Sequence, residues 1–327
     1  MLRYETEINM KKHYTEQVHK TVLKLKQFSD CFSFAVVADS HLDNSLCDTL
    51  ENIKAVENEA GFSCVVHLGD FLNGSYPKKL TSEIMKEQMK QFINASGNAP
   101  FYPVQGNHDG YMEMIGSTPN LVCDELWHEW TSFTDDYKNV YREGDKPYFY
   151  VDYSEEKIRL VILCTFYNEI NGDKLEKIYG TDKEQIDWLE NTALDISDRT
   201  VLIFSHDAPF EYFDERAMTE NPRINGNLLA DTVKRAEEKR GFTLAAWFVG
   251  HFHGDYIGKV NGINFILTGS QTAYVPFLWD MPEGGYYPER VLGTKSEDLW
   301  DAAVLDKKER VIRLFRFGGG ADRELRY

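Results

Sequence analysis

The sequence lacks long apolar runs, and this absence argues against membrane insertion. Its longest apolar stretches, at residues 160–164 and 244–249, have only the length of strands. A membrane-spanning helix needs roughly 18 or more consecutive apolar residues. Residues 1–7 also lack the basic and apolar segments of a secretory signal. We therefore expect a cytoplasmic protein with no membrane partner.

The sequence is also poor in cysteine. Its five cysteines are odd in number, well separated and without a C-x-x-C pair. Neither a disulfide framework nor a zinc–thiolate site is therefore expected. A chain of 327 residues is long enough to bury a substantial core without such crosslinks.

Basic side chains are outnumbered by acidic ones. Lysine and arginine total 36 against 53 aspartates and glutamates, which gives a net charge of −17. Because nucleic-acid backbones are bound largely through lysine and arginine, nucleic acid is not an expected partner. The chain also lacks the G-x-S-x-G nucleophile motif and the G-x-x-x-x-G-K-[ST] phosphate loop. A small or locally recognised substrate fits these absences better.

Strand patterns and helix patterns alternate along the chain. Apolar strand patterns at residues 32–38, 63–68 and 101–105 are separated by helix patterns at residues 48–60 and 80–95. Further strands are expected at residues 147–153, 158–165, 200–204, 244–249, 263–267, 302–305 and 311–317, and further helices at residues 182–194 and 227–240. This alternation predicts an α/β fold, a layered β-sandwich of two mixed sheets flanked by helices.

We expect two parts in the chain. Residues 1–30 form an N-terminal helical extension, and residues 31–327 form a single domain. An insertion rich in aromatic residues and glycine, at about residues 270–300, is expected at the rim of the site or at a contact between subunits. The sequence leaves the oligomeric state open.

Polar clusters follow five of the predicted strands, at the point where each strand ends. In folds of this class, ligands collect at the carboxyl ends of the strands. Histidine, aspartate and asparagine suit Mn²⁺, Fe²⁺, Zn²⁺ or Co²⁺ better than they suit Ca²⁺ or a metal that prefers thiolates. The clusters are Asp39-x-His41, Gly69-Asp70, Gly106-Asn107-His108-Asp109, Ser205-His206 and Gly250-His251-x-His253.

Two features of spacing favour a shared site. Two clusters hold residues at i and i+2, and at the end of an extended strand this spacing can place both side chains on one side. Glycine precedes three of the clusters, at positions 69, 106 and 250. Because glycine has no Cβ, backbone and metal can approach each other closely there.

Taken in order, D-x-H, G-D, G-N-H-D, H and G-H-x-H resemble the motifs of the calcineurin-like metallophosphoesterase superfamily. Each short motif is common by itself, but five in this order, each after an apolar strand, are specific. The resemblance spans about residues 33–270. It implies the calcineurin-like phosphoesterase fold and two divalent metal ions, chosen from manganese, iron, zinc and cobalt.

The resemblance also implies a role for each candidate ligand. One metal would be bound by Asp39, His41 and His253, the other by Asn107, His206 and His251, and Asp70 would bridge the two. Two such ions activate a water molecule and clamp the attacked phosphoryl group.

The same resemblance implies that His108 faces the substrate. Its role would be a general acid for the leaving group, which we expect, or a hydrogen-bond donor to a phosphoryl oxygen. Asp109 would either orient His108 or stabilise the loop by hydrogen bonds. Where protein Ser/Thr phosphatases have a supporting aspartate and purple acid phosphatases a tyrosine ligand, this chain has Asn73. This departure favours a bacterial-type enzyme over those two branches and leaves the partner of His108 unassigned.

Other polar residues carry weaker signals. Residues 210–227 follow the candidate ligand His206 closely. Within them, Arg223 and Asn225 can reach a phosphate or a sugar, or can belong to a surface loop. His67 lies inside a predicted strand, and we expect it to be a hydrogen-bonded core residue.

The sequence therefore predicts an enzyme, a dinuclear-metal-dependent hydrolase of phosphate esters. A small-molecule phosphodiester is slightly preferred over a monoester as the substrate, and His108 acts as the general acid. A DNA-processing nuclease is one alternative, although the acidic balance argues against it. A metal-containing binding module without catalysis is the other, although His108 and every expected ligand are present.

Overall fold

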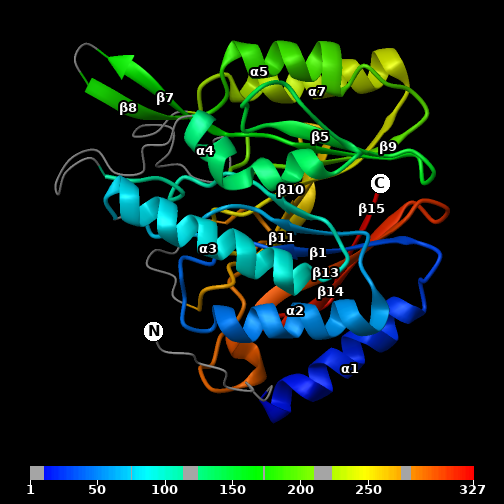
Figure 1. Cartoon of the computed structure of the whole chain (residues 1–327). Coiled ribbons are helices and arrows are strands. Elements are labelled where there is room, and N and C mark those ends of the chain that lie inside the picture. The colour runs from blue at the N-terminus through cyan, green and yellow to red at the C-terminus, as the bar shows by residue number, and fades with distance from the viewer. Residues whose placement is uncertain (1–10, 75, 113–123, 172–173, 210–222, 274–280) are drawn as a thin grey trace.

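The computed structural model describes residues 11–74, 76–112, 124–171, 174–209, 223–273 and 281–327. Two large mixed sheets lie face to face, and helices cover their outer sides (Figure 1). The predicted α/β fold, a β-sandwich of two mixed sheets flanked by helices, is confirmed.

The first sheet has six strands in the order β15-β14-β13-β1-β2-β3. Its parallel part consists of β1 (Phe32–Val37), β2 (Cys64–His67) and β3 (Phe101–Pro103). Its antiparallel part consists of β13 (Leu299–Asp306), β14 (Val311–Gly318) and β15 (Arg323–Arg326). The three parallel strands therefore end at the same edge of this sheet.

The second sheet has seven strands in the order β11-β12-β10-β9-β6-β5-β4. Its parallel centre consists of β6 (Ile158–Ile162), β9 (Thr200–Phe204), β10 (Thr243–Val249) and β12 (Ile263–Leu267). Antiparallel strands extend both edges: β11 (Tyr256–Val260) on one side, and β5 (Phe149–Tyr153) with β4 (Val140–Arg142) on the other. The central strands are nearly continuous apolar runs because both of their faces are buried.

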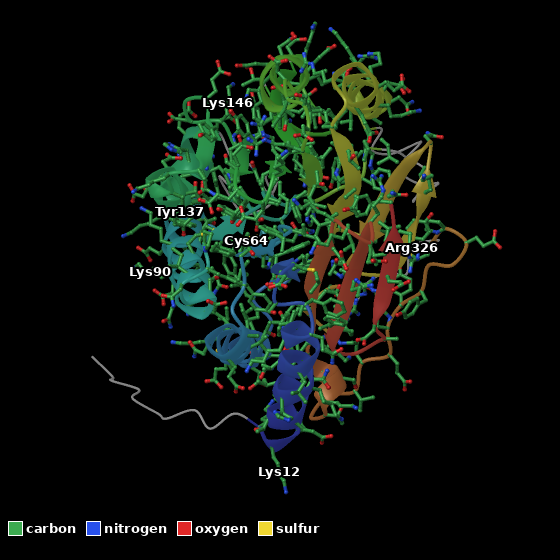
Figure 2. All side chains as sticks on the ribbon, turned by 90° about the vertical axis from the view of Figure 1, so that its right-hand side faces the viewer. Lys12, Cys64, Lys90, Tyr137, Lys146 and Arg326 are labelled. Carbon is green, nitrogen blue, oxygen red and sulfur yellow. The ribbon has the colours of Figure 1, made fainter. Side chains whose placement is uncertain are left out.

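The core between the sheets is largely aromatic and aliphatic. Phe34 of β1 packs edge to face against Phe204 of β9 and Phe248 of β10, with ring centroids 6.0 and 5.6 Å away. Cys64 of β2 is buried in the same core (Figure 2). This packing joins the strands that precede the polar clusters into one rigid unit.

Helices on the outer side of the first sheet form a second core. The helices are α1 (Lys12–Lys26), α2 (Leu46–Ala60), α3 (Lys78–Ser96) and α4 (Asp124–Thr131). Tyr14 and Val18 of α1 belong to the same hydrophobic cluster as α2, α3 and the outer face of the sheet. Lys12 and Lys90 point from these helices into solvent (Figure 2).

The second sheet is covered by α5 (Lys183–Trp188) and α7 (Gly226–Arg240). The helix predicted at residues 182–194 continues beyond α5 as a π-helical turn, Leu189–Ala193. Within the part of the chain that the structure describes, no helix combines the length and the apolar character needed to cross a membrane.

The sequence patterns missed one hairpin that bears on the site. It consists of β7 (Phe166–Asn171) and β8 (Lys174–Tyr179), which pair only with each other in the described structure. Figure 1 shows this hairpin standing away from the two large sheets. Its sequence mixes polar and apolar residues and lacks the continuous apolar run by which the buried strands were predicted.

Candidate metal centre

The polar clusters lie in the loops that follow β1, β2, β3, β9 and β10. Because these strands are parallel within each sheet, their carboxyl ends bring the five loops together. In the described residues, the side chains form two groups whose ligand atoms lie within 4.8 Å of one another. The first donor group is Asp39, His41 and His253, and the second donor group is Asp70, His206 and His251.

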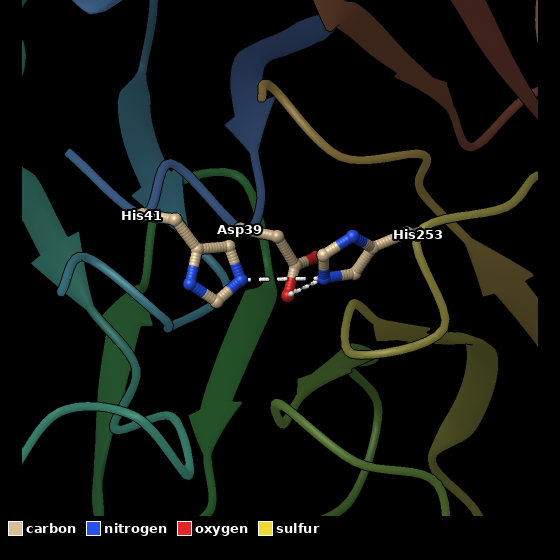
Figure 3. A group of neighbouring side chains, drawn as sticks. All are labelled: Asp39, His41 and His253. Carbon is tan, nitrogen blue, oxygen red and sulfur yellow. Dashed lines mark hydrogen bonds and ion pairs between the residues drawn. The ribbon is translucent and has the colours of Figure 1, made fainter. Parts of the chain in front are cut away.

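The first donor group joins the loop after β1 to the loop after β10 (Figure 3). His41 Nε2 lies 3.2 Å from His253 Nε2. His253 Nε2 also lies 3.6 Å from Asp39 Oδ1. Three potential ligand atoms from two distant segments thus converge on one point.

The second donor group includes a fourth residue, Asn107. Its side-chain oxygen lies 2.9 Å from both His206 Nε2 and His251 Nδ1. Asp70 Oδ2 lies 3.3 Å from His206 Nε2 and 3.5 Å from His41 Nε2. The Asp70 carboxylate, a member of the second donor group, therefore also lies beside the first.

Two histidines are oriented by backbone carbonyl groups. His41 Nδ1 lies 3.0 Å from the carbonyl oxygen of Leu72, and His206 Nδ1 lies 2.7 Å from that of Leu68. When Nδ1–H donates to a carbonyl, Nε2 of the neutral ring is left with a lone pair that can bind a metal. These rings, with buried carboxylates beside them, fit a pair of divalent cations.

The electrostatics also fit positive charge at this position. Burial, reinforced by the neighbouring Asp70, raises the pKa of Asp39 well above its usual range. Burial alone would raise the pKa of Asp70, but His206 together with His108 and His41 holds that pKa well below its usual range. Burial alone would lower the pKa of His206, but Asp70, with smaller help from Asp39 and the Leu68 carbonyl group, raises it to about 10. The buried carboxylates therefore favour positive charge at the centre, and a bound cation would supply that charge.

Other histidines of the centre stay neutral. Burial and the nearby His41 lower the pKa of His253 to about 3. Burial, with nearby His206, also lowers the pKa of His251 well below its usual range. Neutral imidazole is the form that ligates a metal.

The backbone explains how the side chains converge, and it corrects the argument from strand alternation. Asp39, His41, Asp70, His251 and His253 all have positive φ, between 46° and 65°. They lie in loops beyond the strands, so the i, i+2 spacing does not act through an extended chain. His251 and His253 in fact belong to different donor groups. Left-handed non-glycine residues are costly, and their concentration is typical of functional sites.

The three glycines permit close contacts between the loops. A Cβ on Gly69 would lie 2.7 Å from the backbone nitrogen of Gly106 and 2.8 Å from His206 Nδ1. A Cβ on Gly106 would overlap the backbone nitrogen and carboxylate of Asp70, and one on Gly250 would lie 2.9 Å from Asp39 Oδ2. The space that a side chain would need is therefore already filled by backbone and candidate ligands.

His108 lies at the edge of the centre. Its ring centroid is 5.0 Å from that of His41, and its Nδ1 lies 3.2 Å from the carbonyl oxygen of Asn73. Its backbone nitrogen donates to Asp70 Oδ1 over 2.7 Å. The residue at position 73 thus contacts His108 through its main chain, which explains how an asparagine can stand there.

Asp109 is buried and stabilises the loops. Its carboxylate accepts hydrogen bonds from the backbone nitrogens of Asp70, Phe71, Leu72 and Gly106, at 2.7–3.2 Å. Burial and the nearby Asp70 raise its pKa to about 7. Of the two roles expected for Asp109, these contacts favour loop stabilisation, and a direct catalytic role stays a prediction.

The two residues expected to contact substrate are held by the fold. Arg223 is buried, and its Nε donates to Asp207 Oδ2 over 2.8 Å. Asn225 precedes α7, and its side-chain nitrogen donates to the Thr181 carbonyl oxygen over 2.9 Å. Substrate binding by Arg223 and Asn225 stays a prediction, and residues 210–222 lie outside the described structure.

Other expectations concern the surroundings of the centre. His67 is buried, and its Nε2 lies 2.7 Å from Ser40 Oγ, as expected for a core histidine. In the insertion at about 270–300, Tyr286 pairs through its backbone with Asp255, two residues beyond His253. Residues 274–280 of that insertion lie outside the described structure.

Sequence reasoning missed one charged residue at the centre, Lys177 of β8. Its Nζ donates a hydrogen bond to the main-chain oxygen of Asn107 over 3.0 Å. Burial lowers the pKa of Lys177 to about 8, against the opposing effect of Asp70. The Gly172-Asp173 pair between two short runs with β-forming residues is a hairpin signal that could have found β7–β8, but nothing in the sequence distinguishes Lys177 from the other charged residues there.

Comparisons with known proteins agree with this fold. A comparison with curated protein sequences gave no match. A dimetal phosphatase from Danio rerio superposes with a TM-score of 0.57 at 14% identity, covering 91% of this chain and 99% of that one. A putative 5'-nucleotidase from Staphylococcus aureus has a TM-score of 0.43 at 14% identity, covering 90% of this chain and 54% of that one.

At 14% identity, the similarity to the dimetal phosphatase shows a shared fold and nothing about activity. The TM-score of 0.43 for the nucleotidase is too low to support a conclusion. The family assignment comes from the sequence. A model of the calcineurin-like phosphoesterase family matches residues 32–255, more than half of the chain. The matched region begins at β1 and contains every candidate ligand found in the two donor groups. The chain therefore belongs to the calcineurin-like phosphoesterase family.

Proposed function

We propose that the protein is a dinuclear-metal-dependent hydrolase of small-molecule phosphate esters. The observation that carries this proposal is the position of Asp70, whose Oδ2 lies 3.5 Å from His41 in one donor group and 3.3 Å from His206 in the other. A carboxylate between two sets of imidazole donors suits a shared ligand of two neighbouring ions. The dimetal phosphatase of similar fold lends support.

The residues divide between two ions. Asp39, His41 and His253 would hold one ion, Asn107, His206 and His251 would hold the other, and Asp70 would serve both. Manganese, iron, zinc and cobalt all suit these oxygen and nitrogen ligands. When bound, such a pair of ions supplies an activated water and stabilises charge on the attacked phosphoryl group.

His108 protonates the leaving group in this proposal. The Asn73 carbonyl oxygen beside Nδ1 orients the ring, so that Nε2 is the nitrogen free to serve the substrate. Asp109 acts indirectly, because its hydrogen bonds hold the backbone that carries Asp70 and Gly106.

We place phosphodiesters slightly ahead of phosphomonoesters as the substrate class. The support is the absence at position 73 of the aspartate of protein Ser/Thr phosphatases. A substrate screen in which monoesters alone are turned over would overturn this preference.

The decisive experiment is reconstitution with metal. Protein stripped of metal and reloaded with Mn²⁺ is assayed with bis-p-nitrophenyl phosphate and p-nitrophenyl phosphate, with Asp70→Asn as the matched control. Activity that returns with metal, and is lost in Asp70→Asn, supports the proposal. If the reloaded protein hydrolyses neither these esters nor a broad set of natural phosphate esters, the proposal is wrong and the binding-module alternative gains.

A further inference from the structure

The hairpin β7–β8 brings a cation to the metal centre from outside both sheets. Its base packs against the candidate ligands: the Phe166 ring lies 5.6 Å from that of His206, and the Tyr179 ring lies 6.2 Å from that of His251. Lys177 precedes Tyr179 by two residues on β8. Because side chains alternate along a strand, Lys177 shares the face of Tyr179, toward the centre.

Lys177 is close to the second donor group. Its Nζ lies 3.0 Å from the main-chain oxygen of Asn107, whose side-chain oxygen faces His206 and His251. Asn107 therefore contacts the Lys177 ammonium through its main chain and the ligand histidines through its side chain. An anion held there comes within reach of the lysine side chain.

No carboxylate among the described residues pairs with Lys177. Among the described residues, no carboxylate lies within 4.0 Å of Lys177 Nζ. Its one hydrogen bond goes to a neutral carbonyl group, and Nζ also lies 5.0 Å from the centroid of the Tyr179 ring. Lys12 and Lys90 also lack an ion pair among the described residues, but their side chains are exposed, whereas that of Lys177 is partly buried. By contrast, Arg223 nearby is paired with Asp207.

A half-buried ammonium group without a counter-ion loses hydration, which one hydrogen bond and a contact with an aromatic ring replace only in part. It has three N–H donors, and Lys177 uses one of them on Asn107. The remaining donors suit an anionic oxygen, and lysine binds phosphate as a point charge.

We propose that Lys177 is a substrate-binding residue whose ammonium group contacts an anionic oxygen of the phosphoryl group bound beside the second donor group. This inference rests on the proposed function, since it concerns the same site. It extends that function by giving the β7–β8 hairpin a role in recognising the phosphoryl group.

The test compares Lys177→Met, Lys177→Arg and the control Lys183→Met in Mn²⁺-loaded protein. Methionine keeps an unbranched stem without charge, and arginine keeps the charge. Lys183 is exposed on α5 and pairs with Asp187 at 2.7 Å, so its loss reports only the general effect of removing a lysine. The readouts are the calorimetric Kd of inorganic phosphate, the KM of the ester turned over, and bound metal.

We expect Lys177→Met to raise the phosphate Kd and the KM by about 10- to 100-fold, the effect of losing a hydrogen bond to a charged group. Bound metal should be unchanged, Lys177→Arg should stay within about fivefold of the parent, and Lys183→Met should match the parent. The proposal is overturned if phosphate binds Lys177→Met as tightly as the parent, or binds Lys177→Arg as weakly as Lys177→Met.

Phosphate binding needs no turnover, so it separates the two proposals. If no ester is hydrolysed but the lysine variants change phosphate affinity as expected, the role of Lys177 stands while the catalytic proposal fails. If esters are hydrolysed and phosphate affinity is the same in all variants, the catalytic proposal stands and the role of Lys177 fails.

Discussion

His108 differs from the candidate ligands around it because its side chain belongs to neither donor group. Its ring stands beside His41, and its Nδ1 lies near the Asn73 carbonyl oxygen. We expect His108→Ala to lower kcat by about 10²- to 10⁴-fold, the usual contribution of a general acid, without loss of bound metal. Steady-state kinetics and elemental analysis of the purified variant test this together.

A series of leaving groups separates the two roles considered for His108. A general acid matters most when the leaving group is a poor one, so the defect should shrink for p-nitrophenolate and grow for an alkoxide. A hydrogen-bond donor to a phosphoryl oxygen would give a similar defect throughout the series. Loss of metal in His108→Ala would contradict the placement of its side chain outside both donor groups.

Asp109 should matter for stability more than for the chemical step. Replacement by alanine leaves four buried backbone N–H groups without their acceptor, in the loops after β2 and β3. We expect Asp109→Ala to lower the free energy of unfolding by at least about 3 kcal/mol, measured by denaturant titration. Asp109→Asn, which keeps one acceptor oxygen, should recover part of that loss. Unchanged stability in both variants would refute the role in the loop.

At the scale of elements, the turn between β13 and β14 depends on the carboxylate of Asp306. Asp306 Oδ1 accepts hydrogen bonds from the backbone nitrogens of Lys308 and Glu309, at 3.1 and 3.0 Å. The hydrogen bond from Glu309, with smaller help from Arg313, lowers the pKa of Asp306. The carboxylate thus stabilises the fold above its unfolded pKa of about 3.9, and the contribution is lost as the pH falls through the lower folded pKa.

We therefore expect Asp306→Ala to destabilise the protein by about 1 kcal/mol at pH 7, and by less as the pH falls below about 4. Urea titrations of the parent and the variant across this pH range measure the difference. A difference that stays constant with pH would mean that the turn does not depend on the ionised carboxylate.

At the scale of the molecule, the metal centre joins the two sheets. Its ligands come from the loops after β1, β2 and β3 on one side and after β9 and β10 on the other. An ion bound only by the folded state stabilises that state, by about 2.7 kcal/mol when its free concentration is 100 times Kd. For a chain of 327 residues, that corresponds to a rise in Tm of roughly 4 °C.

Scanning calorimetry of metal-free protein with increasing Mn²⁺ tests this expectation. The Tm should rise with metal concentration in the parent, and much less in Asp70→Asn, where the carboxylate between the donor groups is removed. An equal rise in both proteins would show that the stabilising ions bind elsewhere.

Much of the centre could be predicted because strand ends are visible in sequence. An apolar run that stops at Asp39, Asp70 or His206 shows where a buried strand ends, and parallel strands of one sheet end together. The order of the motifs then gave the family, which the family model confirms. The layered fold followed from the same alternation of strand and helix patterns.

Some features depend on contacts between segments far apart in the sequence, and no local pattern shows them. Positive φ at the candidate ligands arises where loops from both sheets meet, so spacing alone gave a wrong reason for their convergence. The Asn73 contact with His108 runs through a main-chain oxygen, which every residue has.

Lys177 shows this limit most clearly. The sequence by itself determined which residues could bind metal, because ligand chemistry belongs to the residue type and strand ends follow from apolar runs. Only the tertiary structure placed Lys177, because its hairpin has no continuous apolar run and packs against His206 and His251 from a part of the chain outside every motif. Its position depends on packing between segments far apart in the sequence. Every lysine carries the same charge, so the residue type alone does not show which lysine lies at the metal centre.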